Sequence, residues 1–514
     1  METLSDKIPN GSIAPPDAPA ERGQRSSGLC VSPGYSLALI AAVACWFIAI
    51  DSPLRLDETA NYWIIEKGLS QIWTRLGPLG SPIYNYYLWF ATRITGTNEI
   101  GMRIPSVLAM LGAAYVFYLC ARRLFRRETA IVALIIFCAN PIVVFAAIDI
   151  RPYALVALTT SATILILLRL RKDVSLWLAG VFGVFSALIL YCHFLAAAVL
   201  PAFLLTFILW KRRSGPVFWK QLIAGLSVFV LVSLPLVPKL VGMFRTAGTH
   251  VYQSAPGPIL LLEMFAPGVQ PVAFLVAILV AALTIRKSVK PHFQRWQMEL
   301  CLPLMLIPLL ILYGVSVCTS IHIFAYRHIL IAIPGIALFW ACCIDQFESR
   351  VVELAFCLTL AAVTLSVYIL SPSARQHGTP WKYAIAVAEK NASRDNAPVL
   401  VCSSYVESNY VEMPLHSAKE SRYFSPLAYY RLSVPVVPLP YALNTQAKQI
   451  GTSFLAQASR QHERFLAMGF KFSYRTLDWL RQQEAAQYTV RRLGVYDGVK
   501  VLEFEPKAVG VEKR

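Results

Sequence analysis

The chain has 514 residues, of which 56% are hydrophobic and 15% are charged, and its formal net charge is +18. Soluble domains carry about a quarter charged residues, so this composition excludes a soluble globular protein. Most of the positive excess in the apolar part lies in short stretches between apolar segments. There it directs membrane topology, which favours a membrane protein over a nucleic-acid-binding one.

The first segment, residues 1–33, is rich in Pro, Ser, Gly and Ala and contains no apolar core. Such a composition cannot bury enough apolar surface to fold, and we predict a disordered cytoplasmic tail. The chain then divides into a transmembrane domain, residues 34–371, and a polar C-terminal domain, residues 372–514.

Apolar runs of roughly 15 to 20 residues recur from Tyr35 to Leu370, and this length as helix crosses a hydrocarbon layer of ~30 Å. The fold class that we predict is a polytopic α-helical membrane protein with about eleven transmembrane helices. Their expected starts lie near Tyr35, Ile104, Ala130, Pro152, Val174, Phe194, Leu222, Pro271, Leu300, His328 and Val351.

Basic residues cluster after every second predicted span, and they are Arg122, Arg123, Arg126, Arg127, Arg169, Arg171, Lys172, Lys211, Arg212, Arg213, Lys220, Arg286, Lys287, Lys290 and Arg295. The positive-inside rule places these connections and the N-terminus in the cytoplasm. The large loop 51–103 and the C-terminal domain then lie on the outer side of the membrane. In the C-terminal domain a helix-like stretch, Trp381–Glu389, and a strand-like stretch, Val399–Cys402, predict a small α/β fold.

Two adjacent acids, Asp57 and Glu58, follow the first span in the stretch Arg55-Leu56-Asp57-Glu58. One interpretation is structural, because acids in the first turn of a helix stabilise its N-terminus. The other is catalytic, because a carboxylate at the membrane surface can act as a general base.

Further polar residues begin or end other apolar runs on the same predicted side of the membrane. Asp149 and Arg151 follow the third span, His193 follows the fifth, and Arg327 and His328 open the tenth. Each has a structural alternative, such as an interfacial ion pair or an arginine that extends to the interface. Their convergence on one side favours a shared site, since unrelated interfacial residues would be scattered over both.

Four stretches, taken in order, resemble the GT-C superfamily, in the branch of the protein O-mannosyltransferases and lipid A aminoarabinose transferases. They are Arg55–Glu58 with Tyr62, the aromatic stretch Ser81–Trp89, the run Asp149–Tyr153, and Tyr326-Arg327-His328 leading to Pro334. Together they span most of residues 35–370, and the C-terminal domain resembles the family in position only. Relatives often carry His or Lys where this chain has Ser81, so a phosphate or metal contact from that position is in doubt.

The resemblance implies a glycosyltransferase that transfers a monosaccharide, with inversion, from a polyprenyl-phosphate carrier to an envelope acceptor. Asp57 is then the general base, and Glu58 and Asp149 orient the base or the acceptor. Phosphate ligands would be Arg327, Arg151 and Arg55. Further substrate contacts would come from Tyr62, Tyr84, His193, Tyr326 and His328.

Metal dependence stays open, since Asp57, Glu58, Asp149, His193 and His328 are all donors that a divalent ion accepts, although their spacing matches no metal motif. The expected partners are a polyprenyl-phosphate-linked sugar, membrane lipid, and a glycan, lipid or protein acceptor. The sequence does not distinguish among these acceptors or among sugars. A transporter or flippase of lipid-linked sugars is the alternative, although no comparable cluster lies on the cytoplasmic side.

Overall fold

The structure is a computed structural model that describes residues 32–77, 80–211, 216–246, 255–285, 294–371, 381–415 and 417–507. Nearly all of the predicted cytoplasmic tail lies outside these ranges, as do the basic residues at 212–213 and 286–290. Those predictions therefore stay untested.

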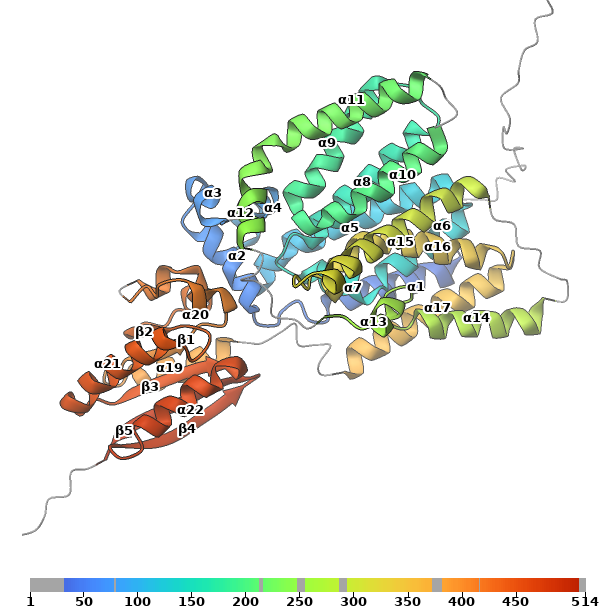
Figure 1. Cartoon of the computed structure of the whole chain (residues 1–514). Coiled ribbons are helices and arrows are strands. Elements are labelled where there is room, and N and C mark those ends of the chain that lie inside the picture. Colours follow the sequence, from blue (N-terminus) through green and yellow to red (C-terminus); the bar gives the residue numbers. More distant parts are fainter. Residues whose placement is uncertain are drawn as a thin grey trace, which may run out of the picture.

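The N-terminal part of the molecule is a helical bundle (Figure 1). Its long or apolar helices are α1 Pro33–Ala44, α5 Glu99–Leu124, α6 Arg127–Cys138, α7 Pro141–Ile148, α8 Tyr153–Leu170, α9 Leu176–Cys192, α10 Leu200–Lys211, α11 Pro216–Ser233, α14 Gln270–Thr284, α15 Arg295–Cys318, α16 Ile333–Asp345 and α17 Arg350–Leu370. The shorter ones are α2 Leu56–Glu66, α3 Ile72–Arg75, α4 Pro82–Thr95, α12 Val237–Thr246 and α13 Pro258–Glu263, with 3₁₀ helices η1 Cys45–Phe47, η2 Leu69–Gln71, η3 Phe194–Val199, η4 Leu234–Leu236 and η6 Tyr326–Ala332.

In the described ranges seven helical segments have the length and hydropathy to cross a membrane, and the pair α6 and α7, bent by 64°, makes an eighth if counted as one span. Three shorter apolar segments, Pro33–Phe47, Leu176–Cys192 and Gln270–Thr284, complete the bundle. These eleven segments begin within a few residues of the eleven predicted starts. The prediction of a polytopic helical membrane protein is confirmed.

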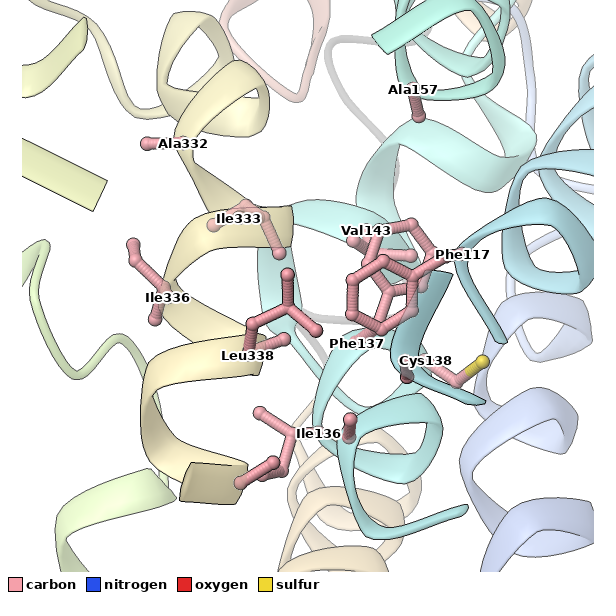
Figure 2. Packing of buried hydrophobic residues seen from close by; sticks show 14 of the residues in the cluster. Phe117, Ile136, Phe137, Cys138, Val143, Ala157, Ala332, Ile333, Ile336 and Leu338 are labelled. Atoms are coloured by element: carbon pink, nitrogen blue, oxygen red, sulfur yellow. The ribbon is translucent and has the colours of Figure 1, made fainter. Parts of the chain in front are cut away.

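The core of the bundle lies where α5, α6, α7, α8 and α16 meet (Figure 2). Phe117 of α5 stacks on Phe137 of α6 with ring centroids 4.8 Å apart. Small residues bring helices together elsewhere: Gly335 of α16 packs directly on the α15 backbone at Leu304 and Met305. Since lipid offers no hydrophobic driving force between helices, such close packing is what holds a bundle together in a membrane.

One end of the bundle is held by a charge cluster around the buried carboxylate of Glu353. Glu353 at the start of α17 accepts hydrogen bonds from the Tyr35 hydroxyl, at 3.0 Å, and from Arg126, which also contacts Asp345 at 3.1 Å. The acids offset the charge of Arg126, one of the basic residues whose cytoplasmic location the sequence predicts. Because α5 is 26 residues long, this end lies about 39 Å from the opposite end, where α2 to α4 are found.

The C-terminal domain contains a five-stranded sheet of order β2-β1-β3-β5-β4. Its strands are β1 Val399–Cys402, β2 Val436–Leu439, β3 Phe465–Phe470, β4 Tyr488–Tyr496 and β5 Val499–Pro506. Its helices are α19 Trp381–Ala392, α20 Ser425–Tyr430, α21 Thr445–Gln461 and α22 Tyr474–Gln483, with 3₁₀ helices η7 Val406–Tyr410, η8 Ala418–Glu420, η9 Arg422–Phe424 and η10 Lys471–Ser473. β1 pairs in parallel with β2 and β3, and β5 pairs antiparallel with β3 and β4.

Alternate residues of the sheet face two helical layers. Val399 and Val401 point toward α19, while Leu400 and Cys402 point toward α21 and α22. The domain is therefore a three-layer α/β sandwich, and β1 covers the residues that the sequence predicts. The C-terminal domain contacts the bundle mainly through α20, which packs against α2 (Figure 1).

Candidate active site

A cavity of about 890 Å³ opens between the α2 end of the bundle and the C-terminal domain. Six of the predicted site residues line it, although they come from four distant stretches of chain: Arg55, Asp57, Arg151, His193, Arg327 and His328. A cavity of this size lies within the usual range of small-molecule sites.

The two adjacent acids of α2 have different environments. Glu58 is fully buried, where it accepts hydrogen bonds from the Arg55 backbone N–H at 2.8 Å and from Arg103 at 3.0 Å. Asp57, whose side chain is 36% exposed, faces the cavity. Successive side chains on a helix diverge by about 100°, so both interpretations of the pair apply, one to each residue.

Glu58 also fixes the turn that carries Arg151. The Ile150 N–H donates to Glu58 Oε1 at 3.1 Å, and Asn61 Nδ2 donates to the Ile150 carbonyl at 2.8 Å. Ser106 of α5 donates to the Asp149 carbonyl at 2.8 Å. These bonds hold Arg151 in place beside α2.

Arg151 Nη1 donates to Asp57 Oδ2 at 2.8 Å. Burial alone would raise the pKa of Asp57, but the guanidinium groups of Arg151, Arg327, Arg55 and Arg422 together outweigh it and lower that pKa to about 2. Asp57 is therefore ionised at neutral pH.

Arginine dominates the charge of the cavity. Five arginines line it, Arg55, Arg75, Arg151, Arg327 and Arg422, against the acids Asp57 and Glu407. Guanidinium groups are the preferred ligands of phosphate because they offer a planar fork of charged donors. The cavity is suited to a substrate that carries an anionic group next to a carboxylate.

Two histidines lie beside these charges. The His193 and His328 rings are 5.7 Å apart, and His193 stacks on Tyr153 at 5.6 Å. The Leu195 N–H donates to His193 Nδ1 at 3.3 Å, so the neutral ring carries its proton on Nε2. His328 Nδ1 lies 2.7 Å from the Ile323 carbonyl oxygen, which can only accept, so its Nε2 is the acceptor atom.

Other predicted site residues lie outside the cavity lining. Asp149 and Tyr84 are fully buried beneath it, and Tyr62 packs edge-on against Tyr429 with ring centroids 4.9 Å apart. Tyr326 is 42% exposed at the start of η6. Their predicted roles as substrate or acceptor contacts stay untested, and the position of Asp149 directly before Arg151 suits a supporting role.

The predicted metal donors do not assemble as a ligand group. In the described part of the chain, no three His, Cys, Asp or Glu side chains lie together as metal ligands. Asp57 is paired with Arg151, while Glu58 is bonded to Arg103 and the Ile150 amide. These residues serve as partners of arginine and of the backbone.

The C-terminal domain supplies lining residues that were not identified from the sequence. Tyr405, Glu407 and Arg422 reach the cavity from that domain. His322, a further imidazole that the sequence places close to Arg327 and His328, also lines the cavity. Single polar residues in a polar domain give no sequence signal. The one available hint was the aromatic content of the domain, which supplies Trp381 and Tyr441 to the cavity.

Residues 79–237 match the family described as dolichyl-phosphate-mannose-protein mannosyltransferase. The fold is similar over nearly the whole chain to ArnT from Cupriavidus metallidurans in the apo state, with a TM-score of 0.55, 12% identity, and coverage of 91% of this chain and 97% of that one. The family match and the ArnT-like fold both agree with the GT-C resemblance that the sequence shows. Both the predicted resemblance and the predicted enzyme class are confirmed.

Two further structures are similar to this chain. ArnT from Cupriavidus metallidurans bound to undecaprenyl phosphate gives a TM-score of 0.53 at 12% identity, covering 92% of this chain and 98% of that one. The Archaeoglobus fulgidus oligosaccharyltransferase tethered with an acceptor peptide gives 0.44 at 11% identity, covering 89% and 69%. Among curated protein sequences, none matches the chain significantly.

Proposed function

We propose that this chain transfers a monosaccharide from a polyprenyl-phosphate carrier to an envelope acceptor, with inversion at the anomeric carbon. The observation that supports this most directly is the placement of one ionised carboxylate, Asp57, among arginines in a single cavity. A similar structure is described as bound to undecaprenyl phosphate, and the matching family is described by its dolichyl-phosphate sugar donor.

In the proposed reaction the acceptor hydroxyl oxygen attacks the anomeric carbon while the bond from that carbon to the phosphate oxygen breaks. Asp57 receives the hydroxyl proton. Polyprenyl phosphate leaves with the electron pair of the broken bond, and Arg327, Arg151 and Arg55 stabilise its charge. Glu58 acts by positioning, since it anchors both α2 and the turn before Arg151.

The low pKa of Asp57 makes it a weak base before substrate binds. A donor phosphate near Arg151 and Arg327 brings a negative charge that opposes their effect, and it raises the pKa of Asp57 when the acceptor is in place. The base is therefore strongest in the complex that can react.

The proposal places the cavity and the C-terminal domain on the outer face of a bacterial inner membrane, and the N-terminus in the cytoplasm. The basic residue Arg126 and the cavity lie at opposite ends of the bundle, as this topology requires. On that side a sugar carried by lipid can meet a polar acceptor while its tail stays in hydrocarbon.

The test compares wild type with Asp57→Asn in purified form, using a labelled polyprenyl-phosphate sugar and crude envelope acceptor. We expect a loss of transfer of about 10² to 10⁴, the usual contribution of a general base. Asp51→Asn changes an exposed acid of the same loop outside the cavity and should behave as wild type. Undiminished transfer by Asp57→Asn would refute the base assignment.

The same assay separates the enzyme from the alternative transporter. A transferase forms a new glycosidic bond whose anomeric configuration, read by NMR, is opposite to that of the donor. A flippase moves the labelled lipid between leaflets and forms no glycosidic product.

A further inference from the structure

The C-terminal domain is bonded directly to the helix that carries the proposed base. The Tyr405 hydroxyl donates to the Leu56 carbonyl at 2.9 Å, and Trp63 Nε1 of α2 donates to the Glu420 carbonyl at 2.8 Å. The hydroxyls of Thr59 and Ser425 are 3.0 Å apart. These contacts lie on both sides of η9 in sequence, so η9 is held in a fixed position relative to α2.

Arg422, the first residue of η9, lines the same cavity as Asp57. Its guanidinium carbon lies 5.6 Å from the Tyr423 ring centroid and 6.0 Å from that of Tyr405. A Cβ at Gly77 would lie 3.2 Å from Arg422 Nη1, so the guanidinium also reaches the loop that follows α3. The aromatic rings and the glycine fix the direction of the side chain.

The ion pairs of the described residues do not use Arg422. Its charge nevertheless acts on the site, since it is one of the four guanidinium groups that lower the pKa of Asp57. It is the weakest of the four in that effect, whereas Arg151 is the strongest. Arg422 therefore adds positive charge to the same site from the C-terminal domain.

We propose that Arg422 binds an anionic group of a substrate, so that the C-terminal domain forms part of the substrate site. This inference rests on the proposed function. The bound group is a phosphate or a similar oxyanion, contributed either by the polyprenyl-phosphate donor or by the acceptor. A guanidinium already directed by neighbouring rings loses little conformational freedom when it binds such a group.

The first experiment measures the affinity of undecaprenyl phosphate alone for the full-length protein in detergent. It compares wild type, Arg422→Gln, Arg422→Lys and Arg460→Gln. Arg460 is exposed on α21 outside the cavity, so its variant makes the same charge change without the proposed contact. The second experiment measures KM for donor and for acceptor in the transfer assay with the same four proteins.

If the group belongs to the donor, Arg422→Gln weakens undecaprenyl phosphate binding by about 10- to 100-fold, as expected for a charge-assisted hydrogen bond. If it belongs to the acceptor, binding of the lipid is unchanged and the acceptor KM rises by a similar factor. Arg422→Lys retains the charge and should show a smaller change in the same quantity. Arg460→Gln should match wild type.

Unchanged lipid affinity together with unchanged KM values in Arg422→Gln would overturn the inference. Should that variant fail to fold, the same two measurements on Arg422→Lys decide, because loss of the planar fork must still weaken one of them. Failure of wild type to bind undecaprenyl phosphate would instead count against the proposed function.

Discussion

Arg151 Nη1 contacts Asp57 Oδ2 at 2.8 Å across 94 residues of sequence, so the turn after α7 and the first turn of α2 meet at one point. The bond keeps the carboxylate ionised and directs it into the cavity. It also ties the position of the base to that of an arginine that lines the same cavity.

Arg151→Gln should remove a positive charge that stabilises the ionised form of Asp57. The pKa of Asp57 is about 2 in the wild type, so its protonation should not reduce activity at pH 5. Without Arg151, burial raises that pKa, and the acid limb of the kcat/KM profile should move to higher pH. Arg151→Lys keeps the charge and serves as control. Superimposable acid limbs for wild type and Arg151→Gln would contradict the assignment.

Glu58→Leu should destabilise the protein by about 3–5 kcal/mol, because it leaves the fully buried Arg103 guanidinium without its acid. Thermal unfolding in detergent measures the loss. The control is Glu128→Gln, which removes a largely exposed pair with Arg350 and should cost only about 0–1 kcal/mol. Equal shifts in the two variants would show that Glu58 does not anchor the site.

His193 should make stability depend on pH. Burial first, and then His328, Arg151 and Arg327, hold the pKa of His193 well below its ordinary 6.5. The unfolded chain takes up a proton at His193 near pH 6.5, while the folded protein does not. The free energy of unfolding is therefore unaffected by this residue above that pH and falls as the pH drops below it. We expect unfolding temperature to fall from pH 7 to pH 5, and His193→Gln to reduce that dependence. An identical pH dependence in the variant would show that His193 does not cause the loss of stability at low pH.

Gly183→Ala should loosen the pairing of α9 and α11. A Cβ at Gly183 would overlap the Gly225 carbonyl oxygen, which is backbone and cannot move alone. We expect a loss of about 1–3 kcal/mol in unfolding experiments. Gly112→Ala is the matched control, since its Cβ would meet Leu158 at an ordinary 3.6 Å. A larger loss from the control than from Gly183→Ala would exclude this packing argument.

The sequence by itself determined the class of the molecule and most of its helices. Apolar runs long enough to span a bilayer can satisfy their backbone groups only as helices, so the eleven segments followed from local composition. Alternating basic connections placed Asp57, Arg151, His193 and Arg327 at one end of the bundle. Strand β1 was equally readable from its short apolar run.

Tertiary structure alone decided how the site residues divide their roles. Whether Asp57 or Glu58 faces the cavity depends on how α2 rotates against α5 and the turn at 149–151, which a dipeptide cannot encode. The contribution of Arg422 depends on docking of the C-terminal domain over 300 residues away in sequence. These contacts join segments that are far apart in the sequence, and the local periodicity of side chains carries no information about them. Only the packing of the folded chain brings these residues together.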